Sequence, residues 1–134
     1  MIITINVLLV DDVENSRELL RAAILVCINE HKVEIEANFF HSATGESIPE
    51  QISQYQIDLV YLDIELPNIS GLEVLKQIRQ AKPDIMVVMV SGESSQENVS
   101  IAIKTGANGF IVKPFNSGRI LDSLQNYLKK THQL

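Results

Sequence analysis

Four short apolar runs, each ending at a polar or charged residue, form the strongest pattern in the chain. They are residues 4–10 before Asp11 and Asp12, residues 57–63 with Asp63 as the last, residues 85–90 before Ser91, and residues 109–112 before Lys113. Short runs that are apolar almost throughout predict strands covered on both faces, as in a parallel sheet. In residues 33–40 apolar and polar positions mostly alternate, which predicts an edge strand with one solvated face.

Helical spacing of apolar residues predicts a helix after each strand. The first begins at Asn15 or Ser16 as the cap, ends near Glu30, and turns one face inward: Leu19, Leu20, Ala23, Ile24, Cys27 and Ile28. The others are expected at about 48–55, from Gly71 to near Pro83, at 96–105 with Gly106 closing the helix, and from a Ser117 cap to Lys130.

Strands that alternate with helices predict an α/β fold, a doubly wound parallel sheet of five strands with five helices on both faces. The carboxyl ends of parallel strands share one edge of such a sheet, where ligands usually bind. That topology would gather the polar residues that end the strands: Asp11, Asp12, Asp63, Ser91 and Lys113.

Size and composition restrict the possible functions. A chain of 134 residues with 46% hydrophobic content is expected to form one domain, residues 1–134. Cys27 is the only cysteine, and neither a signal peptide nor an apolar run of about 20 residues is present, so we expect a cytoplasmic protein without membrane insertion. The net charge of −6 disfavours direct binding to nucleic acid.

The residues expected at the sheet edge suit phosphoryl chemistry. Clustered carboxylates repel one another unless a cation lies among them, and an all-oxygen site with few ligands favours Mg²⁺. His31, His41 and His132 are expected far from the strand ends, which disfavours zinc or iron. Lys113 and Ser91 would add an ammonium and a hydroxyl for a phosphoryl group, and an aspartate can be the nucleophile.

Four motifs make the chain resemble the receiver domains of two-component response regulators, in particular the single-domain, chemotaxis type. They are VLLVDD, YLDIELPNISG, VVMVSGE and TGANGFIVKPF, in this order along the whole chain. The resemblance implies a flavodoxin-like sheet with strand order 2-1-3-4-5.

The resemblance also implies a role for each matching residue. Asp63 would be the phospho-acceptor, and Asp12 and Asp63 would hold Mg²⁺ together with the backbone carbonyl of Glu65, with Asp11 acting mainly through water. The switch residues and the lysine that pairs with the phosphoryl group would be Ser91, Phe110 and Lys113, the last followed by a cis bond to Pro114. Phe110 also fits an ordinary core role, and the sequence leaves both interpretations open.

The implied function is a phosphorelay switch that catalyses only its own phosphorylation and dephosphorylation. A histidine kinase or a histidine phosphotransfer protein would phosphorylate Asp63. A downstream protein would then bind the face formed by helix 96–105, strand 109–112 and the helix from Ser117. Met1 and the short THQL tail favour a stand-alone receiver over an excised domain.

Two other functions stay open. A Mg²⁺-dependent small-molecule phosphatase would also use Asp63 as nucleophile, but such enzymes typically have a second aspartate where this chain has Glu65. An interaction module with an inactive site would lack an acid, a hydroxyl or the lysine, and none is missing. Glu65 and Glu93 follow Asp63 and Ser91 by two residues and would affect the lifetime of the phosphoryl group in a direction that the sequence leaves open.

Overall fold

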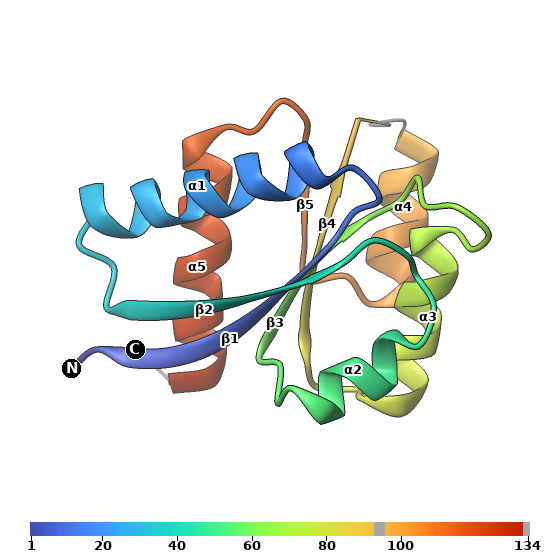
Figure 1. The fold of residues 1–134 in the computed structure, drawn as a ribbon, viewed down its shortest axis with the longest axis horizontal. Coiled ribbons are helices and arrows are strands. Elements are labelled where there is room, and N and C mark those ends of the chain that lie inside the picture. Colours follow the sequence, from blue (N-terminus) through green and yellow to red (C-terminus); the bar gives the residue numbers. More distant parts are fainter. Residues whose placement is uncertain (93–95, 133–134) are drawn as a thin grey trace.

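The computed structural model describes residues 1–92 and 96–132 and has three layers, a parallel sheet between two layers of helices (Figure 1). Its strands are β1 (Ile3–Val10), β2 (Ile35–Ser42), β3 (Leu59–Asp63), β4 (Met86–Ser91) and β5 (Gly109–Val112). Its helices are α1 (Glu14–Glu30), α2 (Ile48–Gln54), α3 (Gly71–Ala81), α4 (Gln96–Thr105) and α5 (Ser117–His132). The strand order β2-β1-β3-β4-β5 confirms the predicted fold class.

Two apolar cores cover the two faces of the sheet, because neighbouring residues of a strand point to opposite sides. In β1, Leu9 packs with α1 and α5, whereas Leu8 packs with α2, α3 and α4. Both side chains are buried, which explains why the central strands are apolar at nearly every position. None of the helices in the described part of the chain is long and apolar enough to cross a membrane.

The predicted edge strand is at the edge of the sheet, but it begins and ends two residues later than expected. Its pairing with β1 runs from Ile3 opposite Ile35 to Val10 opposite Ser42. The partner strand therefore sets its limits, and the alternation of its own residues does not.

Three local predictions about the helices are wrong. The N-cap residue of α1 is Val13, and not Asn15 or Ser16 as predicted. The Asp11 carboxylate accepts a hydrogen bond from the Val13 amide at 2.9 Å, and the helix therefore starts earlier than expected. Leu19 and Leu20 were both expected inside; Leu20 is buried, but Leu19 is 56% exposed.

The start of α5 is the third error. Ser117 is the first helical residue, and the side chain of Asn116 accepts the amide of Gly118 at 2.7 Å. Asn116 therefore caps this helix in place of Ser117.

Gly71 brings α3 against the carboxyl end of β3. Its amide donates to the carbonyl of Ile64 at 2.8 Å, and a Cβ at this position would collide with the backbone carbonyl of Asp63. Only glycine permits this approach. The other predicted glycine, Gly106, ends α4 with a φ of 113°, as expected for a residue just past a helix.

Candidate functional site

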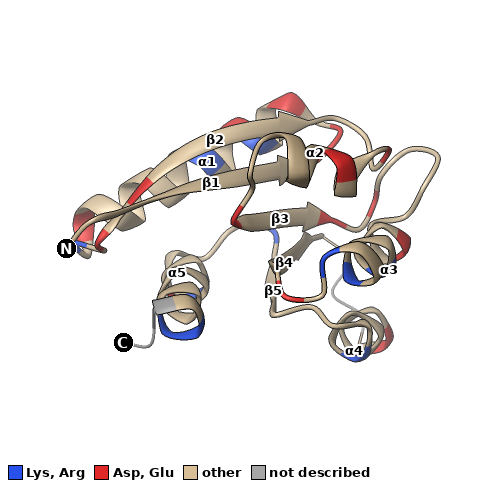
Figure 2. Cartoon of the chain, turned by 90° about the horizontal axis from the view of Figure 1, so that it is seen from below, with Lys and Arg blue, Asp and Glu red and all other residues tan. Residues whose placement is uncertain are grey.

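Three aspartates meet at the carboxyl edge of the sheet, where the tip of β3 is coloured as acidic (Figure 2). Asp63 ends β3, and Asp11 and Asp12 follow the adjacent β1. Among the described residues, each of these three offers a carboxylate oxygen, and the three oxygens lie within 4.8 Å of one another. Asp11 and Asp63 are buried, whereas Asp12 is exposed, so the cluster is open to solvent on one side.

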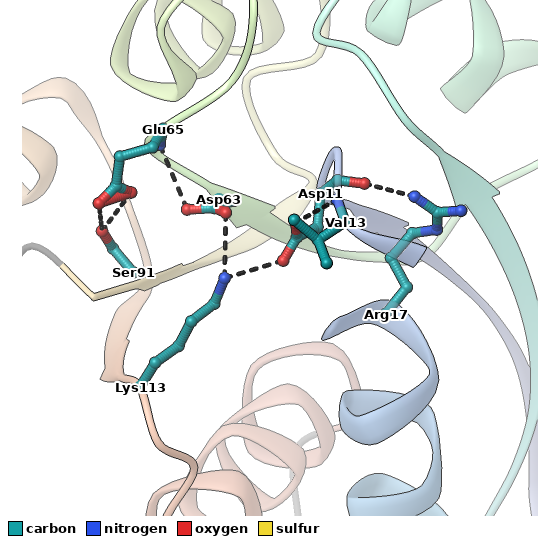
Figure 3. Close-up of polar contacts among 7 residues, drawn as sticks. All are labelled: Asp11, Val13, Arg17, Asp63, Glu65, Ser91 and Lys113. Carbon is teal, nitrogen blue, oxygen red and sulfur yellow. Dashed lines mark hydrogen bonds and ion pairs between the residues drawn. The ribbon is translucent and has the colours of Figure 1, made fainter. Parts of the chain in front are cut away.

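Lys113 links two of these carboxylates, as Figure 3 shows. Its ammonium nitrogen is 2.8 Å from Asp11 Oδ2 and 3.1 Å from Asp63 Oδ2. The lysine follows β5, and its amide donates to the carbonyl of Ser91 at 2.9 Å, so the loop is anchored beside β4. The bond to Pro114 is cis, as the resemblance implies. The structure thus brings the ammonium group of a residue that follows β5, two strands away from β3, to the acidic cluster.

The third contact joins Ser91 to Glu65. Ser91 is fully buried, and its hydroxyl donates to the Glu65 carboxylate, with distances of 3.0 Å to Oε1 and 2.8 Å to Oε2. The Glu65 amide in turn donates to Asp63 Oδ1 at 3.2 Å. The sequence suggested a backbone role for Glu65 and gave no sign of this side-chain contact. Glu93 lies outside the described residues.

Burial and neighbouring charges shift the pKa values of these groups. The pKa of Asp63 is raised to about 6, mainly by burial and also by the nearby carboxylates of Glu65 and Asp11, although Lys113 acts in the opposite direction. For Asp11 burial acts in the same direction, but hydrogen bonds from Lys113, Ser16 and the Val13 amide outweigh it, and the net pKa is lowered. Asp63 therefore ionises less readily than an exposed aspartate, as expected for clustered carboxylates.

Arg17 and His41 were not foreseen as neighbours of the site. Arg17 donates to the carbonyl of Asp11 at 2.5 Å and through Nε to His41 Nδ1 at 3.3 Å. The expectation that His41 lies far from the strand ends is wrong, because β2 extends to Ser42 and carries His41 to the same edge. Nothing in the sequence pattern marks Arg17, except its place in the first helix after the two aspartates.

Phe110 lies in β5, partly buried against the core on the α2, α3 and α4 face of the sheet. It borders a hollow between β5 and α5 whose lining includes Arg119, Ser123 and Asn126. It is therefore neither a fully buried core residue nor a solvent-exposed one, and both interpretations of Phe110 stay open.

The donor set of the cluster fits Mg²⁺. Asp11, Asp12 and Asp63 are all-oxygen ligands, the kind that a hard divalent cation prefers, and no histidine or cysteine belongs to the cluster in the described part of the chain. An exposed Asp12 beside two buried carboxylates also leaves room for the water that Mg²⁺ usually retains.

Comparisons with known proteins agree with this geometry. The family model for the response regulator receiver domain matches residues 7–125. The chemotaxis protein CheY of Listeria monocytogenes is 39% identical over 97 residues, covering 70% of this chain and 82% of its own length. CheY of Bacillus subtilis is 32% identical over 123 residues, covering 92% of this chain and 97% of its own.

Solved structures show the same fold. A CheY-like receiver domain protein from Methanospirillum hungatei has a TM-score of 0.78 at 24% identity, covering 98% of both chains. A CheX–CheY–BeF3–Mg complex from Borrelia burgdorferi gives a TM-score of 0.77 at 26% identity, covering 91% of this chain and 87% of that one. From the family match and these relatives, the chain belongs to the response regulator receiver domain family.

Proposed function

We propose that residues 1–134 act as one receiver domain in which Asp63 accepts a phosphoryl group from a histidine kinase or a histidine phosphotransfer protein. Receiver domains are signalling switches, and the family match favours this role over a small-molecule phosphatase. The observation that carries the proposal is the ammonium of Lys113 between two buried carboxylates, with a third carboxylate beside them. The proposal includes a cytoplasmic location, supported by the buried free thiol of Cys27, and no direct contact with nucleic acid, supported by the net charge of −6.

In the proposed transfer each of these residues has a part. An oxygen of ionised Asp63 attacks the phosphorus of a phosphohistidine and forms a P–O bond. The P–N bond breaks, and its electron pair goes to the imidazole nitrogen, which takes up a proton from solvent. Lys113, 3.1 Å from Asp63 Oδ2, is placed to neutralise the phosphoryl oxygens. Ser91 has the hydroxyl that can donate to one of them.

The same residues would hold the metal. In our proposal Asp12 and Asp63, with the backbone carbonyl of Glu65 and with Asp11 through water, bind Mg²⁺. When bound, the metal supplies positive charge that stabilises the negative charge on the transferred group. Their all-oxygen character supports this assignment.

Phosphorylation of Asp63 is tested by incubating the protein with acetyl phosphate and Mg²⁺ and measuring intact mass. We expect the increment of one phosphoryl group in the wild type, and none after Asp63→Asn or when the metal is chelated. Asp84→Asn is the matched control, because Asp84 is exposed and precedes β4, at the amino ends of the strands and away from the site. This variant should be labelled like the wild type. An increment that persists in Asp63→Asn would contradict the proposal.

The partner surface is the second part of the proposal. We assign it to α4, β5 and α5, where Ile101, Ile103 and Val112 are exposed apolar residues beside the partly buried Phe110. Phosphorylation would change this face through Ser91 and Phe110 by shifting an existing equilibrium. NMR amide shifts on adding beryllofluoride and Mg²⁺ should extend into α4, β5 and α5, and should shrink to the site itself in Ser91→Ala. Equal shifts on that face in both proteins would argue against transmission through Ser91.

A further inference from the structure

The hydroxyl of Ser91 already has an anionic acceptor in this structure. Both carboxylate oxygens of Glu65 lie within hydrogen-bond distance, 2.8 and 3.0 Å from Ser91 Oγ (Figure 3). Ser91 is fully buried, and a hydrogen bond to a carboxylate is stronger than one between neutral groups. We call this pair the Glu65–Ser91 latch.

The latch competes with the role that Ser91 has in the proposed function. A serine hydroxyl has one proton, and here it points to Glu65. The same proton cannot be donated to a phosphoryl oxygen on Asp63 at the same time. Ser91 must therefore release Glu65 before, or while, it binds the phosphoryl group.

Charge acts in the same direction as the hydrogen bond. Glu65 is held close to Asp63, since its amide donates to Asp63 Oδ1 at 3.2 Å. A phosphoryl group on Asp63 adds negative charge near the Glu65 carboxylate. Like charges in a partly buried site repel, so the Glu65 side chain has to move outward. Its contact with the Ser91 hydroxyl is lost in this movement.

We propose that Glu65 is a positioning residue that acts through Ser91: its carboxylate holds the switch hydroxyl in the unphosphorylated state and is exchanged for a phosphoryl oxygen when Asp63 is modified. This inference rests on the proposed function and adds a built-in resistance to activation. The exchange moves only a hydrogen bond, and no covalent bond changes in it. The latch favours the resting state whenever no phosphoryl group is present.

A double-mutant cycle with the phosphoryl analogue beryllofluoride tests the latch. The apparent dissociation constant of beryllofluoride is measured by calorimetry at saturating Mg²⁺. Four proteins are compared: wild type, Glu65→Ala, Ser91→Ala and the double variant. We expect Glu65→Ala to bind the analogue about tenfold more tightly, the scale of one charge-assisted hydrogen bond. In the Ser91→Ala background, which has no hydroxyl to release, the gain should be at most about threefold.

Two further variants sharpen the result. Glu65→Gln keeps an acceptor for Ser91 but removes the charge, and its affinity should lie between those of the wild type and Glu65→Ala. Glu36→Ala removes an equal charge from an exposed position at the start of β2 and should leave the affinity unchanged. Thermal unfolding of each variant checks that differences in affinity do not come from a loss of folded protein.

The outcomes distinguish a failure of the latch from a failure of the proposed function. Equal gains from Glu65→Ala in both backgrounds would mean simple charge repulsion and would overturn the latch, as would no gain in either. If the wild type is phosphorylated on Asp63 while the cycle shows no coupling, only the latch is wrong. If acetyl phosphate labels no residue and beryllofluoride does not bind, the proposed function fails and the latch fails with it.

Discussion

Replacing Asp63 by asparagine should stabilise the protein at neutral pH in the absence of metal. Asparagine keeps the shape of the side chain but carries no charge, so it resembles the protonated aspartate. In the folded protein the ionised form of Asp63 is disfavoured by burial and by the carboxylates of Glu65 and Asp11, even with Lys113 beside it. The variant removes that unfavourable charge.

The pKa of Asp63 gives the size of the effect. It rises from 3.8 to about 6, and each pH unit is worth about 1.4 kcal/mol, so ionised Asp63 lowers the free energy of unfolding by about 3 kcal/mol. A raised carboxyl pKa means that the folded state binds the proton more tightly than the unfolded chain. Its stabilising effect is complete below pH 4 and is lost as the pH rises from about 4 to 6. The advantage of Asp63→Asn should therefore appear over the same interval.

Urea unfolding in a metal chelator at several pH values measures this difference. We expect Asp63→Asn to exceed the wild type by about 2–3 kcal/mol at pH 8 and to match it near pH 4. Asp84→Asn, which removes an exposed carboxylate, should stay within about 0.5 kcal/mol of the wild type. Adding Mg²⁺ at about a hundred times its dissociation constant should stabilise the wild type and Asp84→Asn by about 2.7 kcal/mol, but not Asp63→Asn, which lacks one of the proposed metal ligands. A difference that is absent at pH 8, or that is the same at pH 4, would refute the assignment of a raised pKa to Asp63.

Three other substitutions test one contact at the site and two in the rest of the fold. Gly71→Ala should lower the free energy of unfolding by several kcal/mol and weaken Mg²⁺ binding, measured by urea unfolding and calorimetry, because the added methyl collides with the Asp63 carbonyl. Arg79→Ala, which removes hydrogen bonds to three backbone carbonyls and one side chain, should cost about 3 kcal/mol and leave Mg²⁺ affinity unchanged; a loss below about 1 kcal/mol would contradict its structural role. Tyr61→Phe breaks the buried 2.7 Å bond to Ser123 and should cost about 1 kcal/mol, with labelling of Asp63 by acetyl phosphate retained; a Tyr61→Phe protein as stable as the wild type would show that this bond adds nothing.

Local patterns were enough to predict the elements of the fold. The apolar run that ends at Asp63 is a strand, and the helix expected at 96–105 is found with the same limits. Errors arose where a competing contact decided the boundary. The Asp11 carboxylate accepts the Val13 amide and starts α1 early, and β1 sets the ends of β2 through pairing. Sequence spacing does not report such contacts between different elements.

The sequence by itself determined which residues end the parallel strands, and hence that Asp11, Asp63 and Lys113 would lie at one edge. Because all the strands are parallel, their carboxyl ends lie at that edge whatever the loops contain. Only the tertiary structure decided which of them bond to one another. Lys113 reaches both aspartates, and Ser91 meets the side chain of Glu65, because strand register and the approach of α3 at Gly71 set the distances between the loops. A hydrogen bond depends on tenths of an ångström between segments far apart in the chain, and no periodicity along the sequence encodes that separation.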